Sequence, residues 1–343
     1  MNRSLALLGV VLLLAAGCGG GGEKKSSGTT TGGQNAGEGM KIGLVTDVGG
    51  LNDRGFNHLS FVGLQRAESE LGVMQRVFQA HSTGEYVPNL STFARQGYDL
   101  IIGVGFTEAT AIDTTATNFP DSNFAVVDVD QTEEPHKPPN LLGLLFREQE
   151  TGYLVGYLGG LEEKRRAGPD VIGSVGGQKQ PPVDRFIAGY QAGAKAADPG
   201  IKLLNGYSED WADQAKCKQI ALNQIEQGAG VIFQVAGGCG LGALDAAKEK
   251  GVWGIGVDAD QSFLGPHILT SAVKRVDTAV FLAIKRVVDG NFKGGNVIFG
   301  LKQNGVGIGK ISPKVPKSEV AKVNQIRADI ISGKLRNIPT EIK

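Results

Sequence analysis

Short apolar runs rich in valine and isoleucine alternate with amphipathic helical stretches along the chain from Lys41 onward. Near-continuous apolar runs of this length are typical of parallel strands that are buried on both faces of a sheet. The stretches between them have helical periodicity; in 55–71, for example, Phe56 and Leu59 fall on one face. The pattern predicts an α/β fold with strands at 41–47, 74–80, 99–105, 123–129, 141–146, 171–176, 201–207, 230–236, 252–257 and 268–273.

A long helix expected at 148–165 separates two βαβ series of similar length. This arrangement predicts two similar lobes, each built on a doubly wound parallel sheet. Two late strands, a helix at 276–290 and a C-terminal helix at 317–335 follow. We assign 40–146 plus about 275–292 to lobe 1, 147–274 plus about 293–312 to lobe 2, and about 313–343 to the C-terminal helix, with the late strands at 296–301 and 305–311. The chain is expected to cross between lobes near 146–148, 274–277 and 290–295, and such parallel crossings form a hinge.

The N-terminus has the layout of an export signal. Arg3 precedes an apolar stretch from Leu5 to Ala16 that is too short to span a bilayer, and small residues lead to Cys18. We predict a signal peptide over 1–17, a lipidated Cys18 as in a bacterial lipobox, and a flexible Gly/Ser/Thr-rich tether over 18–39. The alternative is an ordinary signal peptide with an incidental cysteine. The expected location is the extracytoplasmic face of the cell membrane.

Composition excludes several classes of function. The 35 basic and 35 acidic side chains are interspersed, so no basic stripe is present that would favour nucleic acid as a partner. The four histidines are far apart and lack Cys or carboxylate neighbours at ligand spacing, so we predict no metal site. No set of residues for acid–base or nucleophilic catalysis falls on strand-end loops, and we expect neither an enzyme nor a cofactor.

Three carboxylates fall at the ends of predicted strands. Asp47, Asp128 and Asp258 each stand at or next to the last residue of an apolar run. The carboxyl ends of parallel strands line the ligand crevice of an open α/β sheet, so these side chains are expected to accept hydrogen bonds from an amine-bearing or polyhydroxylated ligand. The glycine-containing loop 48–54 after Asp47, which includes Asn52, is expected to approach the ligand closely.

Aromatic residues occur at the same edge of the predicted sheets. Phe56 and Asn57 begin the helix after the first strand, and a solvent-facing ring at Phe56 would stack on a planar base. Phe56 as the first core residue of its helix is the alternative. Trp211 follows the strand 201–207, where it could contribute a second ring from the other lobe. Phe186 is the other candidate for that role, whereas Phe233 lies mid-strand and is expected in the core.

The segment Leu44–Asn57 (LVTDVGGLNDRGFN) resembles the opening motif of the basic membrane protein (BMP) family, whose best-understood kind is the PnrA-like purine nucleoside-binding lipoprotein. Further similarity lies in Phe233–Gly240 (FQVAGGCG), Gly256–Gln261 (GVDADQ) and Thr270–Asp277 (TSAVKRVD). The resemblance implies a type I periplasmic-binding-protein fold and a substrate-binding component of an ABC importer, with permease subunits as partners. It also implies that Asp258 accepts from vicinal ribose hydroxyls and that Lys274 donates to the same sugar.

Two glycines and two cysteines complete the candidate site. Gly237 and Gly238 precede a helix whose free N–H groups could face a ligand oxygen. No Lys or Arg grip for phosphate is visible in these loops, which favours nucleosides over nucleotides. Cys217 and Cys239 are expected on the same edge of lobe 2, where either a disulfide or two buried thiols would fit. Cys239 stands where members of the family usually carry Thr or another small polar residue.

Three other interpretations compete with a nucleoside receptor. A sugar- or autoinducer-binding protein of the same fold would share the acidic, aromatic cleft. A dinucleotide-dependent enzyme is suggested by Gly238–Ala243 (GCGLGA) with Asp258 about 20 residues further on, but its strand is not the first of the domain. A membrane-tethered sensor that delivers a ligand to a signalling partner is the third.

Overall fold

The computed structural model describes residues 36–342. The signal peptide predicted over 1–17, the lipidation expected at Cys18 and the tether up to residue 35 lie outside the described residues. Among the described helices, none is both long and apolar enough to cross a membrane.

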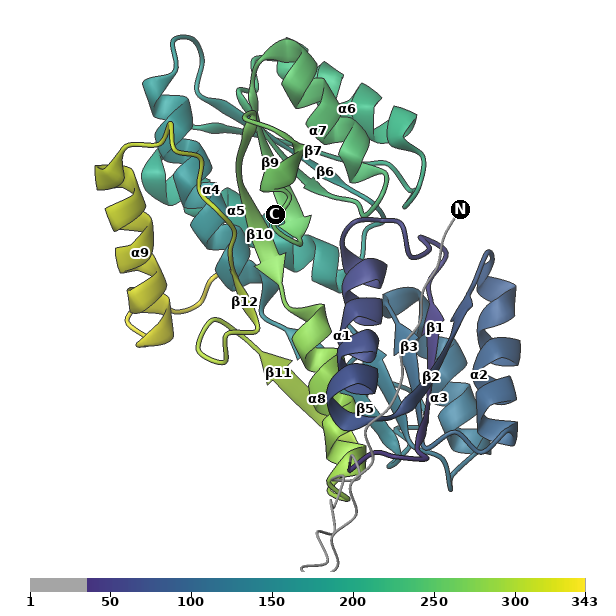
Figure 1. The fold of residues 1–343 in the computed structure, drawn as a ribbon. Coiled ribbons are helices and arrows are strands. Elements are labelled where there is room, and N and C mark those ends of the chain that lie inside the picture. Colours follow the sequence, from purple (N-terminus) through teal and green to yellow (C-terminus); the bar gives the residue numbers. More distant parts are fainter. Residues whose placement is uncertain (1–35, 343) are drawn as a thin grey trace, which may run out of the picture. The chain divides into compact units, whose positions relative to one another are not determined.

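Lobe 1 contains a six-stranded parallel sheet in the order β11-β5-β4-β3-β1-β2. Helices α1 and α8 pack together on one face, and α2 and α3 cover the other (Figure 1). Both faces of the sheet are apolar because both are covered. Successive residues of a strand point to opposite faces, and Ile101 and Ile102 of β3 accordingly belong to separate buried clusters. The elements are β1 (Lys41–Thr46), α1 (Phe56–Leu71), β2 (Met74–Gln79), α2 (Tyr86–Arg95), β3 (Leu100–Val104), α3 (Ala109–Asn118), β4 (Phe124–Val127), β5 (Leu141–Phe146), α8 (Val276–Val288) and β11 (Gly295–Phe299).

Lobe 2 repeats this topology with the strand order β12-β10-β9-β8-β6-β7. Only its edge strand β12 is antiparallel to its neighbour. Helices α4 and α5 cover one face, α6 and α7 the other, and α9 packs along α4 (Figure 1). The elements are α4 (Glu148–Arg165), β6 (Val171–Gly176), α5 (Pro181–Ala197), β7 (Lys202–Tyr207), α6 (Gln214–Glu226), β8 (Val231–Val235), α7 (Gly240–Lys250), β9 (Trp253–Asp258), β10 (Ile268–Lys274), β12 (Val306–Ile308) and α9 (Lys317–Ile331).

Every strand predicted between Lys41 and Val273 is present, but the assignment of the late strands needs a correction. The region 293–312 was expected in lobe 2, yet β11 pairs with β5 of lobe 1 in parallel register. This strand directly follows α8, which packs on lobe 1, so the chain stays there until Phe299. The third crossing therefore lies at 300–305 rather than at 290–295.

The three crossing segments are hydrogen-bonded to one another. Arg147 N donates to the carbonyl of Phe299 over 3.0 Å, and Arg275 N donates to that of Gly305 over 2.8 Å. Neighbouring crossings of this kind are the usual construction of a hinge between two rigid lobes.

Helices α4 and α5 approach each other closely at glycine residues. A Cβ atom on Gly156 would collide with the carbonyl of Tyr190, and one on Gly193 with the carbonyl of Tyr153. The backbones are therefore in direct contact at these positions, and α4 is held firmly against lobe 2.

We predict that Gly156→Ala lowers the free energy of unfolding by about 1–3 kcal/mol, because the added methyl overpacks a backbone contact. Gly159→Ala is the matched control on the same helix, since its Cβ would meet only side chains, the nearest at 3.4 Å. The control should be neutral or more stable by up to about 1 kcal/mol through helix propensity. Urea denaturation of both variants tests this, and equal stabilities would contradict it.

Candidate functional site

A cavity lies at the carboxyl ends of strands from both sheets. Its empty space measures about 600 Å³, including the part open to solvent. Both sheets have the doubly wound order in which ligands bind at this edge. The lining residues are Asp47, Gly49, Asp53, Phe56, Asn57, Gly105, Phe106, Asp128, Gln180, Pro182, Val183, Phe186, Trp211, Val235, Gly237, Gly238, Val257, Asp258 and Lys274.

The three strand-end carboxylates converge on this cavity. Asp47 follows β1 and Asp128 follows β4, both in lobe 1, whereas Asp258 ends β9 in lobe 2. Asp128 and Asp258 adopt left-handed backbone conformations, with φ values of 69° and 62°. Such conformations are unfavourable for residues other than glycine, although Asp tolerates them better than most, and they cluster at functional sites.

Asp47 is fixed through one of its carboxylate oxygens. Its Oδ1 accepts hydrogen bonds from Gly49 N at 2.8 Å and from Asn57 Nδ2 at 2.7 Å. Burial raises the pKa of Asp47 to about 6, although these hydrogen bonds oppose the shift. Asn57 is itself buried, and its Oδ1 has no partner among the described residues. The pair therefore offers an unused acceptor toward the cavity.

Asp258 is the least compensated carboxylate of the site. It is only 6% exposed, and no group within residues 36–342 donates a hydrogen bond to its side chain. Burial raises the pKa of Asp258 to about 7; the charge of Lys274 lowers it, and Asp53, Asp128 and Glu148 raise it further. A ligand that brings hydrogen-bond donors would supply what this carboxylate lacks.

Lys274, at the end of β10, is buried among acids and aromatic rings. Its Nζ lies 2.6 Å from both carboxylate oxygens of Asp128 and 2.9 Å from Glu148 Oε1. Burial opposes its charge, but the attraction of Asp128, Glu148 and Asp258 outweighs this and raises the pKa of Lys274. The rings of Phe56, Phe146 and Phe186 surround the ammonium at 4.8–5.8 Å from their centroids.

The sequence did not indicate these partners of Lys274. The ammonium is engaged within the protein, and removing it would leave Asp128 buried without a countercharge and Glu148 with only Arg185, 3.7 Å away; breaking a buried pair in this way typically costs about 3–5 kcal/mol. A Lys274 variant would thus change both stability and any ligand contact, and it is a poor probe of binding.

The aromatic candidates divide into rings that line the cavity and one ring that lies in the core. Phe56 and Trp211 are partly buried and line the cavity from opposite lobes. Phe186 also lines it and packs edge-on against Phe233, which is fully buried in the core as predicted. The ring of Trp211 lies on Gly177, where any Cβ would collide with it. Its Nε1 is buried and has no partner among the described residues.

The predicted binding role of Asn52 needs a correction. This residue was assigned to the binding site, but its side chain is exposed and lines a separate shallow hollow with Arg54 on the outer surface. The adjacent residue Asp53 lines the cavity instead. The reason is local, because the loop turns inward at Asp53, whose carboxylate accepts hydrogen bonds from backbone N–H groups at the start of α1.

Asp53 is the main site residue that the sequence analysis missed. Its oxygens accept from Gly55 N at 3.0 Å, Asn57 N at 2.7 Å and His58 N at 3.1 Å. It therefore caps α1 and holds Phe56 and Asn57 in place. An Asp shortly before the first residue of a helix is a recognisable start signal and could have identified it.

Other lining residues were also missed. Phe106 follows β3 and Gln180 precedes α5, so both stand at the same sheet edges as the predicted residues. Their place after a strand or before a helix was the available signal. By contrast, Gly237 and Gly238 line the cavity where their strand end placed them.

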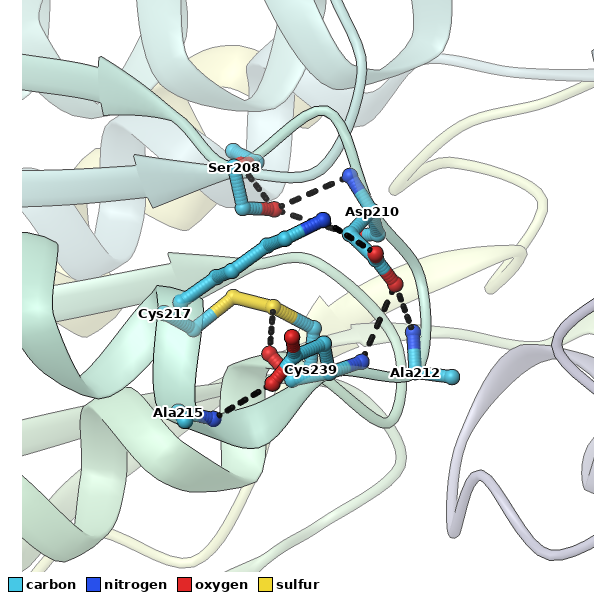
Figure 2. A network of polar contacts seen from close by, with 9 residues as sticks. Ser208, Asp210, Ala212, Ala215, Cys217 and Cys239 are labelled. Atoms are coloured by element: carbon cyan, nitrogen blue, oxygen red, sulfur yellow. Dashed lines mark hydrogen bonds and ion pairs between the residues drawn. A yellow bond between two sulfur atoms is a disulfide. The ribbon is translucent and has the colours of Figure 1, made fainter.

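The cysteines form a disulfide, Cys217–Cys239, with Cα atoms 5.6 Å apart (Figure 2). Of the two possibilities left open by the sequence, the structure contains the bonded one. Within residues 36–342 no group of three His, Cys, Asp or Glu side chains is arranged to hold a metal ion.

The raised pKa of Asp258 has a consequence for stability. At pH values between 3.8, the ordinary pKa of an Asp side chain, and about 7, Asp258 keeps a proton in the folded protein that it has released in the unfolded chain. This contribution to the free energy of unfolding is therefore full below about pH 4 and is lost as pH rises through 7.

We predict that Asp258→Asn, which cannot ionise, raises the free energy of unfolding at pH 8 by on the order of 1.4 kcal/mol per pKa unit and leaves it almost unchanged at pH 4. Urea denaturation at both pH values measures this. Asp121→Asn, at an exposed carboxyl, should change stability at neither pH. A gain for Asp258→Asn of the same size at pH 4 and pH 8 would contradict the assignment.

Comparison with known proteins agrees with this geometry. Residues 40–339 match the Bmp family, described as ABC transporter substrate-binding protein PnrA-like. The ABC transporter nucleoside-binding protein BmpA of Lactococcus lactis is 35% identical over 86% of this chain and 88% of its own length. An uncharacterized lipoprotein of Pyrococcus horikoshii is 36% identical over 89% of this chain and 76% of its own length.

A solved structure shows the same architecture. The solute-binding protein of an ABC transporter system from Aeropyrum pernix K1 superimposes with a TM-score of 0.80 and 28% identity, covering 88% of this chain and 94% of that one. The likeness confirms the predicted type I periplasmic-binding-protein fold. The chain belongs to the Bmp family of PnrA-like proteins, the substrate-binding components of ABC transporters rather than enzymes.

Proposed function

We propose that this protein captures a purine nucleoside in the cavity between its lobes and delivers it to the permease subunits of an ABC importer. The observation that carries the proposal is the meeting, in one cavity, of two partly buried aromatic rings from opposite lobes with buried carboxylates, one of which, Asp258, accepts no hydrogen bond from residues 36–342. The name of the Lactococcus lactis relative, a nucleoside-binding protein, supports the same ligand class.

The polar groups of the cavity match the donors of a nucleoside. Vicinal ribose hydroxyls donate hydrogen bonds, and Asp258 is a buried carboxylate with free acceptor positions. Asp47 and Asn57 offer further acceptors for the ring N–H or exocyclic amine of a base, and Asp128 retains lone pairs beyond those that Lys274 uses. Phe56 and Trp211 would stack on the base, which contributes about 1–3 kcal/mol per ring.

Charge favours a neutral ligand over an anion. Lys274 is the one cation among the described residues that line the cavity, and its ammonium is already paired with Asp128 and Glu148. Asp47, Asp53 and Asp258 would repel a phosphate group. The alternative ligand class, a neutral sugar, would also satisfy the carboxylates and pack on an aromatic ring, but it has no aromatic area of its own to match two rings.

Binding is proposed to act through closure of the lobes. The crossings at 147, 275 and 300–305 allow the lobes to move as rigid bodies, and a ligand that touches both lobes stabilises the closed arrangement. The permease would then recognise that arrangement, to the extent that the ligand binds it more tightly than the open one.

A calorimetric screen of inosine, adenosine, guanosine, the free bases, nucleotides and monosaccharides tests the ligand. We expect purine nucleosides to bind. Asp258→Asn should bind them at least tenfold more weakly, because it loses a charge-assisted hydrogen bond and a tenfold change in affinity corresponds to roughly 1.4 kcal/mol. Since only the ionised carboxylate accepts through both oxygens, and ionised acceptors form the stronger hydrogen bonds, affinity should rise from pH 5 to pH 8, through the pKa of about 7.

The variant supplies the control for the pH effect. Asp258→Asn should have a flatter pH profile than wild type, whereas Asp121→Asn should keep both the affinity and the profile. Binding of sugars alone would replace the nucleoside assignment with the sugar alternative. Affinity that rises toward pH 5 would remove the ionised Asp258 from the site.

We infer a lipid anchor at Cys18 on the extracytoplasmic face, which the lipoprotein name of the Pyrococcus horikoshii relative supports. A single acyl chain holds a protein to a bilayer only marginally, and two or more hold it firmly. Labelled palmitate should enter the wild-type protein and not Cys18→Ala, and the variant should appear in the soluble fraction. Equal labelling of both proteins would exclude Cys18 as the anchor.

A further inference from the structure

We propose that the Cys217–Cys239 disulfide is a positioning element of the ligand cavity, which fixes the loop that carries Trp211 against the turn that carries Gly237 and Gly238. This inference rests on the proposed function, because it concerns how tightly the cavity holds its ligand. One of its two tests nevertheless needs no ligand, so the two proposals can fail separately.

The disulfide joins the starts of two neighbouring helices. Cys217 lies in the first turn of α6, and Cys239 directly precedes α7. Both side chains are fully buried. The same two helix starts touch at a second point, because a Cβ on Gly242 would collide with the carbonyl of Gln214. The bond therefore ties together two strand-to-helix connections that both reach the cavity.

The loop 208–213 between β7 and α6 is anchored to the start of α6 by its own carboxylates. The Asp210 carboxylate accepts from Ala212 N at 2.9 Å, from Asp213 N at 3.0 Å and from Lys216 Nζ at 2.7 Å. Asp213 in turn accepts from Ala215 N at 3.0 Å (Figure 2). Because these contacts run forward into the helix, a shift of the first turn of α6 would move residues 210–213 with it, whereas Ser208 N and Glu209 N stay bonded to the carbonyls of Gly176 and Gly177.

Trp211 depends on this loop for its position. Its carbonyl accepts a hydrogen bond from Cys239 N at 2.9 Å, which links the loop directly to the start of α7. The ring rests on Gly177 at the end of β6, whereas its Nε1 has no hydrogen-bond partner among residues 36–342. Backbone position, rather than a polar contact of the indole, therefore places the aromatic face in the cavity.

Loss of the disulfide would leave the Cys239 N–Trp211 O hydrogen bond, the ion pairs of Lys218 with Asp245 and Glu249 at the outer surface of α6 and α7, and packing contacts to hold these elements together. The Trp211 loop would then sample more arrangements, and ligand binding would have to order it, which lowers affinity. An oxidising compartment outside the cytoplasm keeps such a bond formed. A disulfide that merely constrains the unfolded chain would instead raise stability and leave affinity unchanged.

A double-mutant cycle separates these roles. Cys217→Ala/Cys239→Ala is made in the wild-type and Trp211→Ala backgrounds, and inosine affinity is measured by calorimetry. We expect a loss of about fivefold or more with Trp211 present and of less than about twofold without it, because coupled residues are non-additive. Unchanged affinity in the first background, or an equal loss in both, would overturn the proposal.

The second test monitors Trp211 directly. The sequence contains two tryptophans, so Trp253→Phe leaves Trp211 as the only one, and acrylamide quenching of its fluorescence is measured without ligand. Removing the disulfide should make quenching about twofold faster, because local opening exposes the ring. If the double variant does not fold, phosphine reduction of the Trp253→Phe protein gives the same comparison.

The two proposals give distinguishable results. Unchanged quenching refutes the positioning role, even if nucleosides bind. Faster quenching in a protein that binds no nucleoside refutes the ligand assignment and leaves the positioning of Trp211 intact.

Discussion

The buried ammonium of Lys274 is the interaction on which the candidate site depends. It ends β10 in lobe 2, yet it pairs with Asp128 of lobe 1 and with Glu148, which begins α4 at the first crossing. Buried carboxylates this close together could not remain ionised without such a countercharge. Lys274 therefore allows the acidic ends of several strands to meet, and it does so at the hinge, where lobe 1 and lobe 2 are joined.

The charge of Lys274 does not offset the burial of every acid of the cavity. Asp47 and Asp258 are buried with their pKa values raised to about 6 and about 7, which means that burial makes their ionised forms less favourable than they are in water. Such unmet acceptors reduce stability and are retained where function needs them. A ligand with several N–H or O–H donors would relieve this unfavourable burial. The lack of donors that lowers the stability of the protein without ligand would therefore also favour ligands that carry them.

How much of this could be predicted from sequence depends on how local each cause is. The positions of Asp47, Asp128 and Asp258 were predictable, because parallel strands bring their carboxyl ends to one edge whatever the details of packing. The partners of Lys274 were not, since Asp128 is distant in the chain and comes from the other lobe. Asp53 lines the cavity in place of the predicted Asn52 because the loop bends inward at that residue, a local detail that the sequence pattern does not show. The edge strand β11 was misplaced because its apolar pattern is the same beside either sheet, and only the packing of α8 decides between them.

The two aromatic faces of the cavity are fixed by different means, but each within its own lobe. Phe56 is held by the Asp53 cap of α1 in lobe 1, and Trp211 is held by the loop and disulfide that join α6 to α7 in lobe 2. With both rings fixed to rigid supports, the distance between them can change only at the three hinge crossings. A planar ligand that contacts both rings therefore couples its binding energy to lobe separation, which is the quantity that a permease contacting both lobes can detect.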